Sequence, residues 1–372
     1  MINGRNHRSE RFEAALTTIT LVLTAVACVL LAVESTALLR KMADQGDVRA
    51  ALGQILFMTI VALLIWGNLV YQLTRLAYFL RRLGHRPAPA WRLEDFCAGA
   101  PPSLTVLVPS YKEELRVVQR TLLSAALQDY PLRRVVLLID DPVHPANPDD
   151  ERALRRIESL PARLQALFAN VARKFRRECA AYERRHAQDA VELTTEAERI
   201  GRLYERAARW LEEQASLLLR EEPGDRLLRD KVFVPLAEAH RARGRRTVER
   251  ARAGKLEEAR LFREYRRLAY LFQVEITSFQ RKRYVNLAHE PNKAMNLNAF
   301  IGLMGKHLRE VRRADGLHLA PCAERIADWT VPDADYLLTL DADSIIVPDY
   351  ALRLAHFMGL PGNESVAVAQ TP

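Results

Sequence analysis

The chain begins with two long apolar segments. Residues 14–33 contain no charged side chain, and residues 50–74 are likewise uncharged and mainly apolar. A helix of about 20 apolar residues crosses the hydrocarbon core of a bilayer, so each segment is long enough to span a membrane. Two buried helices of a soluble protein are the alternative, but uncharged runs of this length are rare in soluble folds. We expect residues 1–82 to form a transmembrane hairpin.

Basic residues predict the orientation of this hairpin. They lie before the first span (Arg5, Arg8 and Arg11) and after the second (Arg75, Arg81, Arg82, Arg86 and Arg92). The connection between the spans holds Arg40, Lys41 and Arg49, which Glu34, Asp44 and Asp47 offset. Because Lys and Arg concentrate on the cytoplasmic side, we expect a multi-pass protein of the cell (inner or plasma) membrane. Both ends of the hairpin and the domain that follows would lie in the cytoplasm.

A change of pattern after residue 82 predicts an α/β domain. Residues 83–102 are rich in proline and read as a linker. Residues 104–108 (LTVLV) and 135–139 (VVLLI) are short apolar runs typical of buried strands, and Pro109 is expected to end the first. Residues 113–127 between them have helical spacing. Strand, helix and strand predict a parallel pair with a right-handed crossover, the first part of a domain over residues 103–142.

The next segment, residues 143–275, has a different character. Arg, Glu, Ala and Leu dominate, and the apolar residues recur at helical spacing. We expect a helical insertion of several antiparallel segments, with breaks at Pro161, Pro223-Gly224 and Pro235. Its charged residues are expected to form a solvated face, and a surface for a protein partner is the alternative.

The α/β pattern resumes in residues 276–372, the second part of the domain. Residues 286–300 predict a loop that runs into a helix, and residues 336–340 predict a strand. A further strand is expected at residues 366–370.

Composition narrows the function classes. Hydrophobic residues make up 49% of the chain, the net charge is +9 and the pI is about 9.5. Much of the Arg is mixed with Glu in helical segments, which argues against a nucleic-acid partner. The cysteines, Cys28, Cys97, Cys179 and Cys322, form no CxxC pair, so neither a zinc site nor a disulfide framework is predicted.

Three groups of polar residues could carry chemistry. Asp341-Ala342-Asp343 follows a predicted strand, and two such carboxylates suit Mg²⁺ or Mn²⁺; a turn that caps a helix is the alternative. Asp140-Asp141 follows another strand and could accept hydrogen bonds from a base or ribose, or could be a turn. Lys293 lies among Asn292, Asn296 and Asn298 near a helix start, which suits a diphosphate. No P-loop, GxGxxG, G-x-S-x-G or H-E-x-x-H motif occurs.

The order of the motifs adds a resemblance. It runs PSYKE (109–113), SAALQDYP (124–131), LLIDD (137–141), KAMNLN (293–298), LDADS (340–344) and QTP (370–372). This series resembles the family 2 glycosyltransferases, in particular their membrane-embedded, cellulose-synthase-like branch. The resemblance covers residues 103–142 and 285–372 and implies a GT-A (Rossmann-like) fold with a mostly parallel sheet.

The resemblance also implies roles for individual residues. Tyr111 and Glu113 match the loop that lies against the nucleotide, where Lys112 replaces the usual Asn. Asp140, with Asp141 beside it, matches the aspartates that hold uracil, and Pro142 replaces a Gly. Lys293 matches the lysine near the diphosphate, where Met295 replaces a common Gly. Asp341 and Asp343 match the metal-binding DxD, which grips the nucleotide-sugar diphosphate through the cation.

The resemblance leads to a specific expectation of function. We expect an inverting, metal-dependent glycosyltransferase that takes a nucleotide sugar, a UDP-sugar in the first place, and builds or exports a polysaccharide on a glycan or lipid acceptor. The TED and QxxRW motifs that carry the family's base and acceptor site do not follow Asp343. We therefore expect a fragment whose catalytic base lies beyond Pro372 and whose sheet is incomplete. The alternatives are transfer to a polyprenyl-phosphate carrier, or a non-catalytic membrane protein that binds nucleotide sugar.

Overall fold

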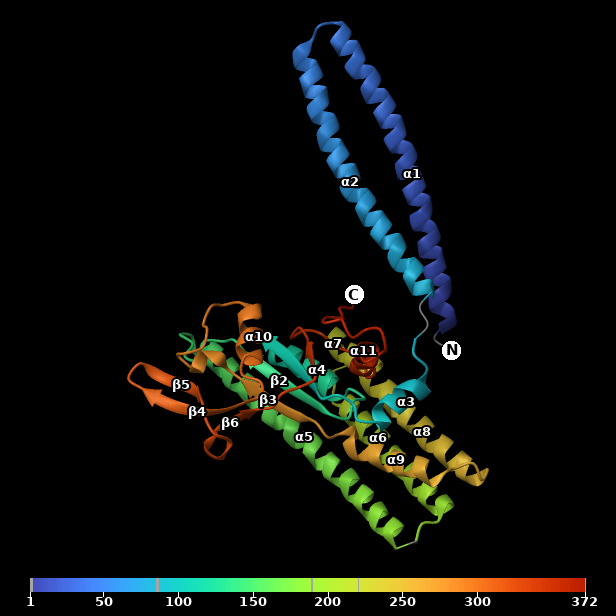
Figure 1. Cartoon of the computed structure of the whole chain (residues 1–372), viewed down its shortest axis with the longest axis vertical. Helices are drawn as coiled ribbons and strands as arrows, with labels where there is room; N and C mark the ends of the chain where they lie inside the picture. Colours follow the sequence, from blue (N-terminus) through green and yellow to red (C-terminus); the bar gives the residue numbers. More distant parts are fainter. Residues whose placement is uncertain (1–2, 85–86, 189, 220, 372) are drawn as a thin grey trace. The chain divides into compact units, whose positions relative to one another are not determined.

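The computed structural model describes residues 3–84, 87–188, 190–219 and 221–371 (Figure 1). The chain divides into two compact units, Met1–Ala88 and Pro89–Pro372. Two residues used in the predictions, Arg86 of the basic flank and Pro372 of the QTP motif, lie outside the described residues.

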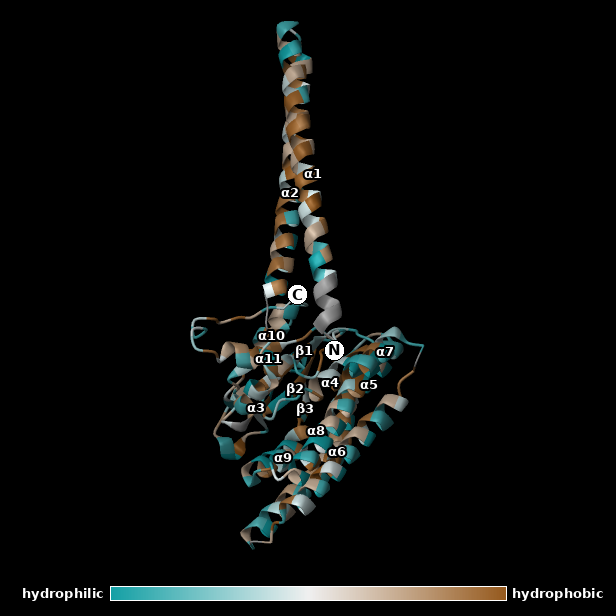
Figure 2. Cartoon of the chain, turned by 90° about the vertical axis from the view of Figure 1, so that its right-hand side faces the viewer, coloured by the Kyte–Doolittle hydropathy of each residue, from teal (hydrophilic) through white to brown (hydrophobic). Residues whose placement is uncertain are grey.

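The first unit is a hairpin of helices α1 (Asn3–Asp44) and α2 (Val48–Gly84). Both are long and apolar enough to cross a membrane, and in Figure 2 most of their length is coloured as hydrophobic. Each helix extends beyond the predicted spans because the polar residues that flank the apolar runs continue it. Polar contacts join the helices: Gln72 Nε2 donates to Thr24 Oγ1 (3.0 Å), Arg75 pairs with Glu13 (2.7 Å) and Arg82 pairs with Glu10 (2.6 Å).

The predicted linker is wrong in part, because it contains helix α3 (Ala90–Ala98). Pro89 immediately precedes this helix, at a position where its missing N–H is not needed. Leu93 is buried and so anchors α3 to the second unit. The prolines that predicted a loop therefore flank a helix rather than exclude one.

A parallel sheet organises the second unit, which makes it a mixed α/β fold. Its strands, in the order β3-β2-β1-β7, are β1 (Leu104–Ser110), β2 (Arg133–Ile139), β3 (Glu275–Phe279) and β7 (Tyr336–Thr339). All neighbouring strands are parallel. Helix α4 (Leu115–Ala126) connects β1 to β2, as predicted. All seven residues of β1 are buried, as expected of a parallel strand covered on both faces.

Strand β1 continues through Pro109, where the sequence predicted its end. Backbone groups point alternately to the two neighbouring strands, and Leu107 accepts from Leu340 on the β7 side. Pro109 therefore faces the same side, but pairing with β7 has already ended at Leu107. Its missing N–H removes no ladder hydrogen bond, so the strand can reach Ser110.

The predicted helical insertion is present between β2 and β3. It consists of α5 (Pro148–Ala187), α6 (Leu193–Ser216), α7 (Pro223–Leu228), a short π-helix η1 (Arg229–Phe233), α8 (Val234–Arg252) and α9 (Glu258–Leu271). Pro223 lies in the first turn of α7, where an N–H is dispensable. Pro235 is the second residue of α8, which continues directly from η1, so the break expected there is an irregular turn within a continuous helical segment. The expected break at Pro161 is wrong, because α5 runs through it. Leu160, Pro161 and Leu164 are all buried, and this packing holds the helix together.

The remaining elements follow β3. They are a 3-10 turn η2 (Arg281–Arg283), α10 (Lys293–Ile301), β4 (Lys306–Arg313), β5 (Gly316–Pro321), a 3-10 turn η3 (Glu324–Ile326), β6 (Trp329–Val331) and α11 (Tyr350–Met358). Strands β5-β4-β6 form a small antiparallel sheet that the sequence analysis did not predict. The strand expected at residues 366–370 is wrong: these residues are described and pair with no strand, and Val368 is 82% exposed.

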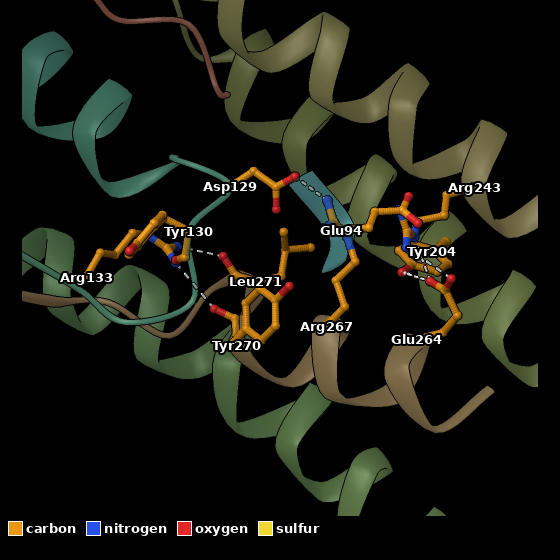
Figure 3. Close-up of polar contacts among 10 residues, drawn as sticks. All are labelled: Glu94, Asp129, Tyr130, Arg133, Tyr204, Arg243, Glu264, Arg267, Tyr270 and Leu271. Carbon is orange, nitrogen blue, oxygen red and sulfur yellow. Dashed lines mark hydrogen bonds and ion pairs between the residues drawn. The ribbon is translucent and has the colours of Figure 1, made fainter. Parts of the chain in front are cut away.

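A buried arginine joins the insertion to the amino end of the sheet. Arg133, at the start of β2, is only 4% exposed. Its guanidinium donates to Ala126 O at the end of α4 (2.9 Å). It also donates to Leu271 O at the end of α9 (2.7 Å), to Tyr130 O and to Tyr270 O, three residues drawn with it in Figure 3. One charged side chain thus satisfies the carbonyls at two helix ends, which otherwise lack partners. Burial lowers the pKa of Arg133 to about 10, so it remains protonated at neutral pH.

We expect Arg133→Met to destabilise the second unit by about 3 kcal/mol or more, since several buried carbonyls lose their donor. Thermal and denaturant unfolding of the full chain would measure this. Arg134→Met is the matched control, because Arg134 is partly exposed and its pair with Glu275 is solvated. The control should cost no more than about 1 kcal/mol. Equal effects of the two substitutions would contradict the role of Arg133.

A buried histidine makes the stability of the insertion sensitive to acid. His240 of α8 is 2% exposed and stacks on Tyr204 (ring centroids 5.8 Å apart). Burial, followed by the charge of Arg267, lowers its pKa to about 3, although Asp129 acts in the opposite direction. The folded chain thus resists a proton that the unfolded chain takes up near its ordinary pKa of about 6.5.

We therefore expect His240 to contribute stability above about pH 6.5 that is lost as the pH falls toward 3. His240→Phe keeps the ring against Tyr204 but does not titrate. The midpoint of unfolding should fall less steeply over this pH range in His240→Phe than in wild type. Identical slopes would contradict the assignment.

Candidate functional site

The parallel sheet brings the predicted acidic residues to one edge. Asp140 and Asp141 follow the last residue of β2, and Asp341 and Asp343 follow β7. β1 lies between these two strands, in register with both, and leads directly to Tyr111. The carboxyl ends of such strands are the usual ligand-binding edge of an open α/β sheet.

Asp140 has a structural partner that the sequence did not reveal. It is 5% exposed, and its Oδ1 accepts from Nε of Arg281 (2.8 Å), a side chain that is fully buried. Arg281 also donates to the carbonyls of Ala288 and Glu290, in the loop that leads to α10. Lys282 Nζ lies 3.4 Å from the same Asp140 oxygen. Asp140 is thus a buried anchor for this loop rather than an open ligand.

Asp141 is the more accessible member of the pair. Its carboxylate accepts from the backbone N–H of Lys112, with both oxygens 3.3 Å from the nitrogen. Burial raises the pKa of Asp141, and the Lys112 amide opposes that shift. A base with an N–H donor could replace or share this hydrogen bond.

Lys112 occupies an unusual backbone conformation. Its φ is +53°, in the left-handed region that Asn tolerates better than Lys. Its Nζ pairs with Asp150 of α5 (2.8 Å), so the side chain is engaged outside the ligand-binding edge. The backbone of Lys112 thus has a conformation typical of Asn, and its side chain contacts α5.

Tyr111 and Glu113 lie on the exposed loop between β1 and α4. The ring of Tyr111 is 51% exposed, and Lys282 Nζ lies 5.5 Å from its centroid. A partly open aromatic face beside a cation suits a flat, polar ring such as a nucleobase. Glu113 is also exposed.

Helix α10 places Lys293 beside Asp341. The side chain of Asn292 accepts from Ala294 N (2.8 Å) and caps the helix. Asn296 is buried and donates to Leu138 O of β2 (3.0 Å), which fixes α10 against the sheet. Lys293, the first residue of the helix, then forms an ion pair with Asp341, and both side chains are more than half exposed.

The two aspartates of Asp341-Ala342-Asp343 are both exposed because the residue between them is anchored. Ala342 is buried, and its carbonyl accepts from Thr121 Oγ1 of α4 (2.6 Å). Ser344 N donates to Asp341 O (3.1 Å) and closes a turn. Among the described residues, no group of three or more His, Cys, Asp and Glu side chains could hold a metal by itself.

The structure thus brings all the predicted site residues to one edge of the sheet, but it gives them unequal exposure. Sequence reasoning missed Arg281 and Lys282. The signal available in the sequence is the basic run Arg281-Lys282-Arg283, which follows β3 after Gln280.

Comparison with known proteins adds no relative: no protein-family model, curated protein or solved structure matches this chain. The resemblance to family 2 glycosyltransferases therefore remains a prediction from the motifs.

We expect Arg281→Met to loosen the loop before α10, because Asp140 and two carbonyls lose a shared donor. Removal of one partner of a buried ion pair costs about 3 kcal/mol or more. Amide hydrogen exchange in residues 285–296 should accelerate more than exchange in β1. Arg283→Met is the matched control, since Arg283 lies in the same turn and is exposed. Unchanged exchange in Arg281→Met would contradict the anchor.

Proposed function

We propose that the second unit forms the donor-binding part of a GT-A glycosyltransferase that uses a nucleotide sugar, a UDP-sugar in the first place. The observation that carries the proposal is the placement of paired carboxylates after β2 and β7, on either side of β1, with Lys293 beside the second pair. This arrangement offers polar groups for a base at one end and charged groups for a diphosphate at the other.

The base would lie near β2. The exposed ring of Tyr111 provides a stacking face, and Asp141 provides a hydrogen-bond acceptor. Asp140, held by Arg281, would help to position the neighbouring Asp141 and would not contact the base itself. This division of roles follows from the burial of Asp140.

The diphosphate would lie near β7. Lys293 is a cation on an exposed side chain, and because its pair with Asp341 is solvated it could exchange the carboxylate for phosphate oxygens. Asp341 and Asp343 fit Mg²⁺ or Mn²⁺, which usually bind through one or two carboxylates and take their remaining ligands from phosphate and water. A bound cation would neutralise charge that develops on the diphosphate.

These residues support the departure of the leaving group. In the inverting reaction, the acceptor oxygen bonds to C1 of the sugar as the bond from C1 to the diphosphate oxygen breaks. The electron pair of that bond leaves on the diphosphate, where Lys293 stabilises it. The proton of the acceptor hydroxyl passes to a general base, which we do not assign to any residue of this chain.

We further propose that α1 and α2 anchor the chain in the cell membrane, with both ends of the hairpin in the cytoplasm. The support is the length and apolar character of the helices, and the Arg residues at the outer ends of both. A glycan or lipid acceptor at the membrane would suit a polysaccharide synthase. Transfer to a polyprenyl-phosphate carrier fits the same hairpin.

Calorimetry with UDP and Mn²⁺ on the full chain tests the donor site. We expect binding that requires Mn²⁺ and that weakens by about 10- to 100-fold in Asp343→Ala, since a charged ligand contact is lost. Asp315→Ala, in the turn between β4 and β5, is an exposed control that should bind as wild type does. Absence of Mn²⁺-dependent UDP binding would overturn the proposal. Binding without sugar transfer would favour the non-catalytic alternative.

A further inference from the structure

A cavity lies at the opposite edge of the sheet from the candidate site. Its volume is about 450 Å³, within the range typical of small-molecule sites. Two of its lining residues lie at the amino ends of strands: Leu132 comes directly before β2, and Gln273 comes shortly before β3. A strand of seven residues is about 23 Å long, so this cavity is separate from the carboxyl ends of the strands.

Helix α9 presents a row of arginines to this cavity. Arg260, Arg263, Arg266 and Arg267 line it, together with Tyr270. Arg260, Arg263, Arg267 and Tyr270 are spaced by three or four residues and so lie on one side of the helix, with Arg266 next to Arg267. The lining also includes the apolar side chains of Trp91 in α3, Pro131 and Leu132, together with the acidic Glu94 and Asp95 of α3.

Two of the arginines of the cavity are already neutralised. Arg267 pairs with Asp129, and Arg243 pairs with Glu264 (2.6 Å) and Glu94 (2.8 Å), as Figure 3 shows. These pairs are part of the buried network that holds α8 and α9 to α3 and the α4–β2 connection. The ligand preference of the cavity therefore depends on the other guanidinium groups of α9.

Two of the remaining arginines have no acidic partner. Arg260 forms a long ion pair with Glu94 (3.9 Å), whereas within the described chain no acidic side chain pairs with Arg263 or Arg266. Arg266 lies over the ring of Phe262, 5.9 Å from its centroid. Asp95 and Glu183 are the remaining acids of the cavity lining, and the guanidinium groups of Arg263 and Arg266 are the ones left for a ligand. Burial raises the pKa of Cys97 to about 12 and that of Cys179 to about 11, so these lining thiols add no negative charge at neutral pH.

We propose that this cavity binds a small organic phosphate. A single carboxylate satisfies one guanidinium group, whereas a phosphate offers more acceptor oxygens and up to two charges to several guanidinium groups at once. The apolar side chains of Trp91, Pro131 and Leu132 in the lining suit the organic part. The ligand would bridge α3 and α9 and should raise the melting temperature of the chain.

The test uses the full chain in detergent with EDTA, which removes the cation that the proposed donor site needs. The probes are AMP, glucose 6-phosphate and inorganic diphosphate, with adenosine as the uncharged control. We expect at least one organic phosphate to bind in calorimetry and adenosine not to bind. The double substitution Arg263→Glu/Arg266→Glu should weaken that binding by about tenfold or more.

A matched control separates this site from a general effect of charge. Arg312→Glu/Arg313→Glu changes the net charge equally, on exposed residues of β4. We expect it to bind the probes within a factor of about two of wild type, since it removes no contact. The inference is overturned if none of the three phosphate probes binds at millimolar concentration, or if both double variants lose binding equally. Because EDTA is present, this result is independent of Mn²⁺-dependent UDP binding.

Discussion

The parallel pairing of β2 with both β1 and β3 is the constraint on which the second unit depends. Since the strands run in the same direction, the chain must return from the carboxyl end of β2 to the amino end of β3. The whole helical insertion is this crossover connection. Its first helix, α5, has 40 residues and is about 60 Å long, far longer than the strands it passes. The other insertion helices are needed to cover the part of α5 that extends beyond the sheet.

Two buried arginines stabilise opposite ends of this sheet. Arg133 ties the end of α9 to the start of β2, and Arg281 ties the loop before α10 to the end of β2. Burial of a guanidinium group costs free energy unless its donors are satisfied, and each of these side chains reaches several carbonyl or carboxylate oxygens. The position of Lys293 therefore depends on an ion pair that lies outside the exposed site. The cavity beside α9 depends on the network around Arg133 and Arg267 in the same way.

The success of prediction varied with the kind of signal. Uncharged apolar runs identified α1, α2, β1 and β2. In β1 and β2 the run is continuous because both faces of these strands are buried. In α1 and α2 the run is long enough to cross a membrane. Strand β4 (KHLREVRR) was missed because it belongs to a small, half-exposed sheet whose residues are mainly charged. Pro109 and Pro161 were interpreted as ends of elements, yet local pairing and packing make both tolerable. Residues 366–370 have a strand-like pattern but no partner in the structure.

The sequence by itself determined which residues lie at the carboxyl ends of the parallel strands: Asp140-Asp141 and Asp341-Ala342-Asp343 each follow a predicted strand. It also determined the two long apolar helices. Only the tertiary structure decided that Asp140 is buried and Asp141 is accessible, because the partner of Asp140 is Arg281, 141 residues away. It likewise decided that, among the described residues, Arg263 and Arg266 of α9 have no acidic partner whereas Arg260 and Arg267 have one. A local pattern records the spacing of residues along one element, whereas burial and pairing depend on which distant segment packs against it.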